Sequence, residues 1–249
     1  MSEKTYLRSI TRGIAAGVGL ASASYASYAA VTWARYGRPR RSKAEQESTL
    51  DRFMAAYEVV ERHEVRVAAP CPVTFLAACE MDFEDSLVIR SIFKARELIL
   101  GGEATNTVQG RGLVPQMTEL GWRILAEVPG HEIVMGAVTQ PWAANPIFRS
   151  LSPDEFLSFH EPGYVKIAWN LRADPAGAGE SVFTTETRAL ATDATARAKF
   201  RLYWSFASPG IWLIRRLMLG HLKREAERRF RAALPQMPDT AASVPELLP

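Results

Sequence analysis

Cysteine is scarce in this chain of 249 residues, which contains only two. Cys71 and Cys79 lie in a segment that we predict to be helical, where a rise of about 1.5 Å per residue separates them by about 12 Å. The two halves of a disulfide lie much closer together than this. We therefore expect two reduced thiols, which suits a cytoplasmic location and excludes the disulfide scaffold of small secreted domains.

Neither sign of charge dominates, since 30 Lys and Arg residues face 27 Asp and Glu residues for a formal net charge of +3. The small excess is concentrated in two clusters rather than spread over one face of a predicted element. A protein that holds a nucleic-acid backbone needs a broad basic surface. The sequence therefore predicts no nucleic-acid partner.

Signatures of catalysis and metal binding are missing as well. The chain has no phosphate-cradling glycine loop and no serine nucleophile elbow. A metal site needs three or four converging donors, and the four histidines lie on separate predicted elements without ligand-like spacing. We predict no catalytic residue, no metal site and no cofactor. These histidines are His63, His131, His160 and His221.

Charged residues are also absent from residues 13–34, a length that suits one crossing of a bilayer, which needs about 20 residues. Tyr25 and Trp33 belong to an aromatic group near the end of this segment, as is common at membrane interfaces. More positive charge follows the segment, over residues 35–43, than precedes it. We therefore predict that residues 1–36 tether the protein to a membrane, with the globular part in the cytoplasm.

Two other interpretations of this segment stay open, because alanine, glycine and serine dominate it. One is a helix that lies on the membrane surface or is only loosely attached, which leaves a soluble cytoplasmic protein as the alternative location. The other is a cleaved signal peptide, since residues 21–23 imitate a cleavage site.

The rest of the chain divides into three parts. Residues 37–50 form a basic polar linker, residues 51–233 form a domain large enough to bury one core, and residues 234–249 form a proline-rich disordered tail.

A long strand followed by a long helix dominates the domain. Val182 to Leu190 is rich in β-branched and aromatic residues, which predicts a strand. Thr192 and Asp193 offer side-chain oxygens to the first amides of a helix. Apolar residues then recur at helical spacing from Ala194, and residues 208–210, Ser-Pro-Gly, predict a kink or two abutting helices.

Shorter elements precede this pair. Pro129-Gly130 is a strong hairpin turn between two strands, and residues 174–179 are expected to form a second hairpin connection. Residues 102–120 are expected to be a loop with short helical pieces, and residues 141–153 a long insertion. The predicted elements are a helix at 50–57, a strand at 57–69, helices at 72–79 and 86–100, and strands at 122–129, 131–142 and 163–174.

This order predicts an α+β helix-grip fold. Antiparallel hairpins must bury one face, and the long C-terminal helix is the element large enough to cover it. We expect a curved antiparallel sheet wrapped around that helix, with the N-terminal hydrophobic helix outside the domain. A cavity between sheet and helix is the natural place for an apolar ligand.

Four segments, in this order, resemble the SRPBCC superfamily, also called START-like or Bet v 1-like: SIFKARELILGG, GWRILAEVPGHEIVMG, EPGYVKIAWNLRAD and TETRALATDATARAKFRLYWSFASPGIWLIRR. The resemblance covers about Tyr57 to Arg229 and is greatest to small bacterial members of unassigned function. The superfamily includes lipid and hormone binders, aromatase/cyclases, coenzyme-Q-binding proteins and oxygenase domains. The resemblance therefore implies a fold and a ligand cavity without selecting an activity.

The predicted cavity lining combines aromatic and aliphatic side chains with one carboxylate, although core packing without a ligand explains each apolar residue equally well. Glu186 shares a strand face with Arg188 and orients a polar ligand group if that face points inward. A solvent-facing ion pair is the alternative interpretation. The predicted lining residues are Ile167, Trp169, Glu186, Tyr203 and Trp204.

Three functions are compatible with these features. The first, which we favour, is binding of a lipid or other hydrophobic small molecule in the cavity, at the membrane surface. The second is a cyclase- or hydrolase-like enzyme, which needs an acid or base such as Glu186 or His131 in that cavity. The third is a non-catalytic interaction module that exposes Trp142 and Phe148 on the loop of residues 141–148.

Overall fold

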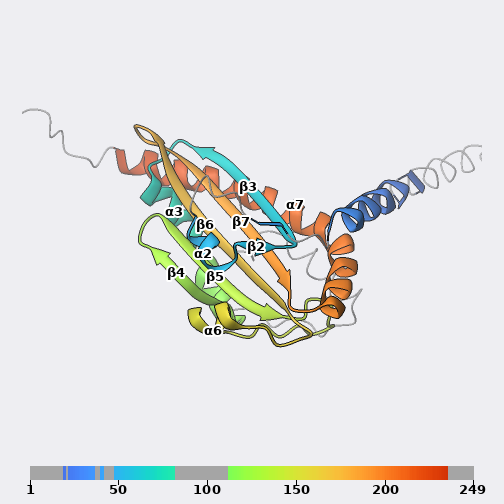
Figure 1. Ribbon diagram of the computed structural model, residues 1–249. Helices are drawn as coiled ribbons and strands as arrows, with labels where there is room; N and C mark the ends of the chain where they lie inside the picture. Colours follow the sequence, from blue (N-terminus) through green and yellow to red (C-terminus); the bar gives the residue numbers. More distant parts are fainter. Residues whose placement is uncertain (1–18, 21, 37–39, 42–47, 82–111, 235–249) are drawn as a thin grey trace, which may run out of the picture.

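The computed structural model describes residues 19–20, 22–36, 40–41, 48–81 and 112–234 (Figure 1). These residues form a five-stranded antiparallel sheet that packs against a long C-terminal helix, which confirms the predicted α+β helix-grip class. The elements are β1 (Arg40–Arg41), α2 (Thr49–Phe53), β2 (Ala56–Tyr57), β3 (Val59–Val67), α3 (Cys71–Cys79), α5 (Leu113–Glu119), β4 (Arg123–Val128), β5 (Glu132–Thr139), α6 (Pro153–Ser158), β6 (Val165–Gly177), β7 (Glu180–Ala191) and α7 (Ala194–Ala233).

The main sheet has the strand order β3-β7-β6-β5-β4, and all neighbours are antiparallel. β4–β5 and β6–β7 are hairpins, and β5 reaches β6 through residues 140–164, which include α6. β3 comes first in the main sheet along the chain and joins its edge beside β7. The β6–β7 connection is tighter than predicted, because pairing continues to Gly177 and Glu180. Gly179 adopts a φ of +74° in this turn, a left-handed conformation that glycine tolerates.

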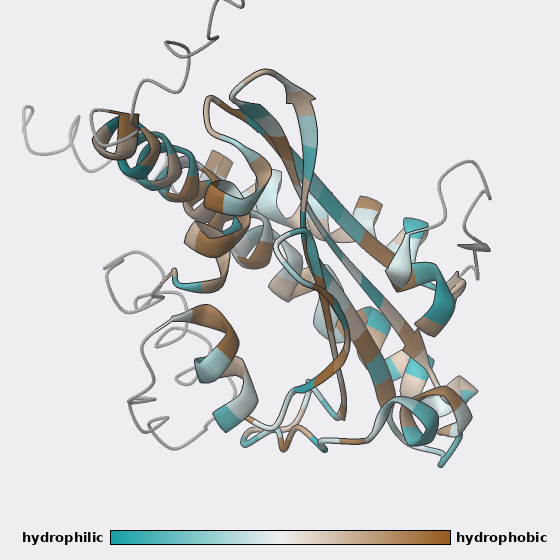
Figure 2. Cartoon of the chain, turned by 90° about the vertical axis from the view of Figure 1, so that its left-hand side faces the viewer, coloured by the Kyte–Doolittle hydropathy of each residue, from teal (hydrophilic) through white to brown (hydrophobic). Residues whose placement is uncertain are grey.

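Successive side chains of a strand point to opposite faces of the sheet. Figure 2 shows how the hydropathy of the residues changes along the strands. Ile167, Trp169 and Leu171 lie on the face covered by α3 and α7, which we call the inner face. Ala168 lies on the opposite, outer face, in an apolar cluster with residues of α2 and α6. The predicted alternation of β6 is therefore confirmed, and each face has its own helical cover.

α7 begins and bends where the sequence predicts. The Asp193 side chain accepts hydrogen bonds from the amides of Thr195 and Ala196, which caps the first turn. Pro209 lies inside the helix and cannot donate to the preceding turn. α7 stays continuous but changes direction, so a kink forms rather than two helices (Figure 1). Residues 194–208 cover one end of the sheet, and residues 209–233 pack beside α3.

The N-terminal helical segment, residues 22–35, lies against the first part of α7 (Figure 1). The Tyr25 hydroxyl donates to the Phe206 carbonyl oxygen at 2.6 Å, and the Arg201 guanidinium lies 3.8 Å from the centre of the Trp33 ring. Within the described ranges, no helix combines the length and hydropathy of a membrane span. The predicted span also includes residues 13–18 and 21, which lie outside those ranges, so the tether stays a prediction.

The remaining sequence predictions concern the short helices, the two cysteines and the C-terminal tail. α5 is one of the short helical pieces expected in residues 102–120, and Cys71 and Cys79 are both free thiols. α6 was not expected, although Ser152 and Glu155 form a complete capping box around a proline, a helix-start signal. The predicted helix at 86–100 and the tail lie outside the described residues.

Candidate functional site

Four of the five predicted cavity residues lie at the interface between the inner face and α7. Ile167 and Trp169 belong to β6, and Ile167 packs against both apolar clusters on this side of the sheet. Tyr203 and Trp204 belong to the first part of α7 and lie in the cluster at the end of the sheet. Trp169 is buried and meets Trp122 edge to face, with ring centroids 6.0 Å apart. The interface is therefore a wall of large apolar side chains.

Glu186 is on the outer face and does not contribute to this wall. Its carboxylate accepts a hydrogen bond of 2.6 Å from Arg188, as their shared strand face suggested. Arg188 also donates to the Asp51 carboxylate at 2.6 Å and to the Met54 carbonyl at 2.7 Å, both at α2. The pair is buried, with side-chain exposures of 10% for Glu186 and 4% for Arg188. Both the cavity role and the solvent-facing alternative are therefore wrong, because α2 covers this face.

A second chain of hydrogen bonds fixes α2 to the outer face. The Asn170 amide donates to Glu132 at 2.7 Å, and the other carboxylate oxygen of Glu132 accepts from the Thr49 hydroxyl at 2.6 Å. The Asn170 side-chain oxygen in turn accepts from the Glu186 amide at 2.9 Å. These buried polar groups satisfy one another, so the outer network is a structural attachment rather than a binding site.

A polar cluster that the sequence did not reveal lies on the inner face. Arg215 of α7 reaches across to β7 and donates to the hydroxyls of Thr185, at 3.3 Å, and Thr187. In the sheet register, Thr187 pairs with Trp169 on one side, while Thr185 pairs with His63 on the other. Paired residues share a face, so these polar groups stand directly beside the apolar wall.

Two nitrogen atoms in this cluster are buried without a hydrogen-bond partner among the described residues: Nε of Arg215 and Nε2 of His63. The nearest carboxylate oxygen, on Glu61, lies 3.6 Å from His63 Nε2, which is too far for a hydrogen bond. Leaving a buried donor unsatisfied costs about 1–3 kcal/mol, and more when it is charged. As far as the structure describes the chain, the cluster therefore has hydrogen-bonding capacity that a bound group can satisfy.

The protonation states follow from burial and neighbouring charge. Burial lowers the pKa of Arg215 to about 10, against an opposing effect of Glu61, so Arg215 remains a cation at neutral pH. Burial and then the Arg215 charge lower the pKa of His63, which is therefore neutral there. Glu61 accepts a hydrogen bond from the Tyr36 hydroxyl at 3.2 Å. The cluster thus offers one cationic and one neutral nitrogen.

The residues considered for acid–base catalysis lie elsewhere. His131 Nε2 is 3.1 Å from an Asp174 carboxylate oxygen at the turn end of the sheet, and Glu186 is on the outer face. No group of three or more metal-ligating side chains occurs in the part of the chain that the structure describes.

The loop of residues 141–148 partly buries its two aromatic side chains. Trp142 packs against the apolar cluster at the start of α7, and the Phe148 ring lies 5.3 Å from that of Trp122. Ile147, which is 77% exposed, is the large apolar residue that the loop presents to solvent. The predicted docking patch around Trp142 and Phe148 is therefore wrong, because both rings are partly buried against the apolar clusters.

Comparison with known proteins gives no family model and no curated protein that matches the chain. Solved structures with similarity include CalU16 from Micromonospora echinospora, at 10% identity over 80% of this chain and 99% of that one, with a TM-score of 0.26. The Zhui aromatase/cyclase from Streptomyces sp. R1128 gives 17% identity over 70% and 97%, with a TM-score of 0.26. A protein from Thermus thermophilus gives 9% identity over 70% and 99%, with a TM-score of 0.25. At these low scores the fold assignment rests on the strand order and α7 of this chain itself.

Proposed function

We propose that this protein binds a lipid or other hydrophobic small molecule at the interface between the inner face and α7. The observation that carries the proposal is a pair of buried nitrogens, on Arg215 and His63 beside the Trp169 wall, that have no hydrogen-bond partner within the described ranges. Small-molecule sites are mostly apolar and hold a few converging polar groups that orient the ligand. The inner face has this composition, whereas the polar groups of the outer face satisfy one another.

The polar cluster favours a ligand with an acceptor oxygen at one end. Such an oxygen accepts hydrogen bonds from Nε of Arg215 and from Nε2 of the neutral His63 when that nitrogen carries the proton. A ligand carboxylate gains more binding free energy here than a neutral oxygen does, because hydrogen bonds that involve a charged group are about twice as strong as those between neutral groups. The hydrophobic body of the ligand then lies along Ile167 and Trp169. A fatty acid or an amphipathic ring compound with an anionic group has this form.

Membership of the SRPBCC superfamily and attachment to a membrane belong to the same proposal. The ordered sequence segments and the helix-grip topology support the first. The charge-free stretch of residues 13–34, followed by a basic run, supports a tether that leaves the domain in the cytoplasm. A protein at the membrane surface has direct access to hydrophobic ligands.

Native mass spectrometry of the full chain, purified without added lipid, tests the binding function. We expect a reproducible extra mass that disappears on denaturation and is extracted as a hydrophobic compound. Arg215→Met should reduce the occupied fraction, whereas the matched control Arg229→Met should not, because Arg229 pairs with Glu225 and Glu80 at the surface.

A fluorescent fatty acid and its methyl ester provide the second measurement. The acid should bind the parent protein more tightly than the ester does, and Arg215→Met should remove this difference. A parent protein that carries no extra mass and binds neither probe would contradict the proposal.

A further inference from the structure

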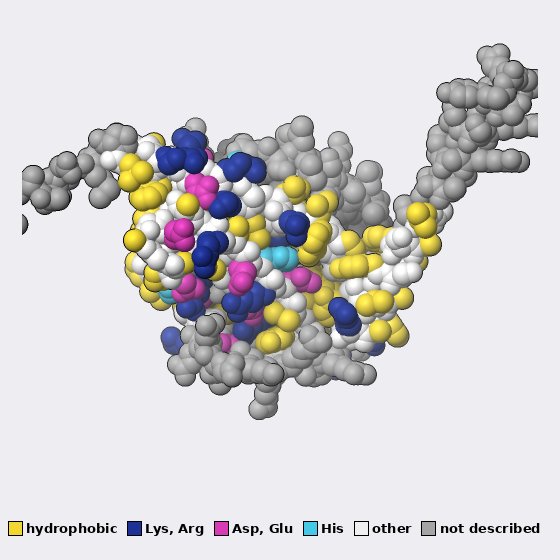
Figure 3. Space-filling view, turned by 90° about the horizontal axis from the view of Figure 1, so that it is seen from above, with side chains coloured by type: hydrophobic (Ala, Val, Ile, Leu, Met, Phe, Trp, Pro, Cys, Tyr) yellow, Lys and Arg dark blue, Asp and Glu magenta, His cyan; other side chains and the backbone are white. Residues whose placement is uncertain are grey.

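Exposed aromatic and aliphatic side chains gather where the N-terminal helical segment meets the bend of α7. Each of six such side chains is between 38% and 55% exposed. The space-filling view shows hydrophobic side chains along this segment and on the adjoining body (Figure 3). We call the set the elbow surface: Tyr25, Tyr28, Trp33, Phe206, Trp212 and Leu213.

Specific contacts make the elbow surface continuous between the two helices. The rings of Tyr25 and Phe206 lie 6.4 Å apart, and the Tyr25 hydroxyl bonds to the Phe206 carbonyl. A groove of about 420 Å³ is lined by Tyr28 from one helix and by Pro209, Trp212 and Leu213 from the other. The proline bend therefore brings the apolar side chains of two separate segments together.

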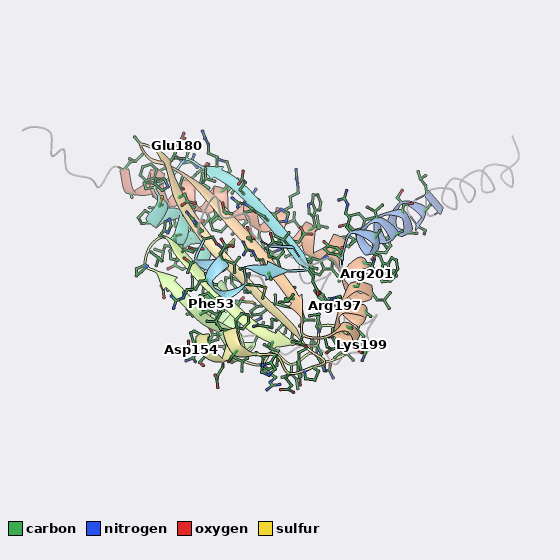
Figure 4. All side chains as sticks on the ribbon, viewed as in Figure 1. Phe53, Asp154, Glu180, Arg197, Lys199 and Arg201 are labelled. Carbon is green, nitrogen blue, oxygen red and sulfur yellow. The ribbon has the colours of Figure 1, made fainter. Side chains whose placement is uncertain are left out.

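The two chain segments that form the elbow surface carry charge of one sign. No Asp or Glu occurs in residues 4–44 or in residues 194–224, while both stretches contain several Arg and Lys residues. Arg201 lies over the Trp33 ring, and the Arg216 guanidinium lies 5.4 Å from the centre of the Trp212 ring. Figure 4 shows Arg201 and neighbouring basic side chains on the first part of α7. An anionic partner is complementary to this arrangement.

We infer that the elbow surface docks onto a lipid bilayer that contains anionic lipids. Tyrosine and tryptophan rings favour the boundary between headgroups and acyl chains, where one edge is apolar and the other is wet. Arginines beside these rings are positioned to meet lipid phosphates while their aliphatic stems cover apolar surface. In this arrangement residues 22–35 lie beside α7 at the membrane surface, which corresponds to the surface-lying alternative for this segment and not to a span. The inference therefore adds α7 to the membrane contact and does not depend on the proposed ligand site.

Vesicle flotation with the full chain tests this inference. The parent protein should bind phosphatidylcholine vesicles containing phosphatidylglycerol more tightly than pure phosphatidylcholine vesicles, and added salt should weaken the binding. Combining Trp212→Ser with Leu213→Ser should weaken it about tenfold, because apolar area is lost from the contact. Arg216→Gln should weaken binding to the anionic vesicles about fivefold and leave binding to the neutral vesicles unchanged.

Two controls keep the measurement specific. Ile147→Ser removes an even more exposed apolar side chain from a different loop and should bind like the parent. Arg215→Met alters the inner site and should also bind vesicles like the parent, so the two proposals can fail separately. If circular dichroism shows that the double variant is not folded, the single variants Leu213→Ser and Arg216→Gln are used for the test instead.

Three results would overturn the inference. The first is a double variant that binds as well as the parent, since the N-terminal residues alone would then account for attachment. The second is a parent protein that does not respond to phosphatidylglycerol. The third is a parent that sediments as a dimer in the absence of vesicles and dissociates in the double variant, which would make a second copy of the chain the occupant.

Discussion

Replacing Arg215 by methionine should separate the stability of the ligand-free protein from its binding function. Methionine keeps a long unbranched stem and removes the charge. The change deletes hydrogen bonds to Thr185 and Thr187, but it also removes a partly buried guanidinium whose Nε atom is fully buried and has no partner among the described residues. Stability and binding are therefore expected to change in opposite directions.

The structure allows the change in stability to be worked out. Lowering the Arg215 pKa from 12.5 to about 10 corresponds to about 3 kcal/mol of unfavourable free energy for the buried charge. The two hydrogen bonds contribute about 1 kcal/mol each in the opposite direction. The balance makes Arg215→Met about 1 kcal/mol more stable than the parent, or about 3 °C in melting temperature for a chain of this length.

Urea denaturation and thermal melting of the ligand-free protein measure this difference. Arg216→Met is the matched control, because Arg216 is exposed on the same helix turn and its replacement should stay within about 0.5 kcal/mol of the parent. Binding of a fluorescent fatty acid should be lost in Arg215→Met and kept in the control. A destabilisation of more than about 1 kcal/mol in Arg215→Met would refute the reasoning, since Arg215 would then be a structural attachment of α7 to β7.

Three further predictions concern other parts of the fold. Arg188→Met removes the buried cation that Glu186 and Asp51 share and should cost about 3–5 kcal/mol in urea denaturation, and a cost below about 1 kcal/mol would show that the network is dispensable. Gly121→Ala should destabilise the protein by about 2 kcal/mol or more, because φ is +96° and the new Cβ would overlap the Phe148 carbonyl oxygen, whereas Gly130→Ala, with open space at φ +71°, should cost about 1 kcal/mol. The pKa of His63 in the folded protein lies below its usual value of 6.5. As the pH falls below about 6.5, His63 is therefore protonated in the unfolded chain before it is protonated in the folded protein. The folded protein loses stability over this range, until the pH reaches the folded pKa. His63→Gln should flatten this loss, and equal pH slopes in parent and variant would contradict the assignment.

Features that depend on neighbouring residues could be predicted from the sequence. The strand period placed Ile167 and Trp169 on one face, and the oxygen of Asp193 marked the first turn of α7. Pro209 marked the bend, because proline has no amide hydrogen to donate. The helix start at Ser152 is equally local, because Ser152 and Glu155 form a capping box, although the residues around it have a loop-like composition.

The choice of inner and outer face could not be predicted in the same way. Alternation shows which residues share a face, and it applies equally well if the whole sheet is turned over. The sequence leaves the direction of the Glu186 face open, and in the structure α2 covers that face and the Arg188 network buries the carboxylate. That cover comes from a distant part of the chain, since Asp51 of α2 lies 137 positions before Arg188.

The inner polar cluster shows most clearly what the sequence determines and what only the tertiary structure decides. The sequence by itself places Arg215 at helical spacing from Ile211 and Leu222, on the buried stripe of α7, and this was the available signal. What Arg215 meets there was decided by the tertiary structure, because β3 crosses to pair with β7 and brings His63 beside Thr185. Local chemistry determined the elements and their caps, while the pairing of distant strands under one helix determined the candidate site.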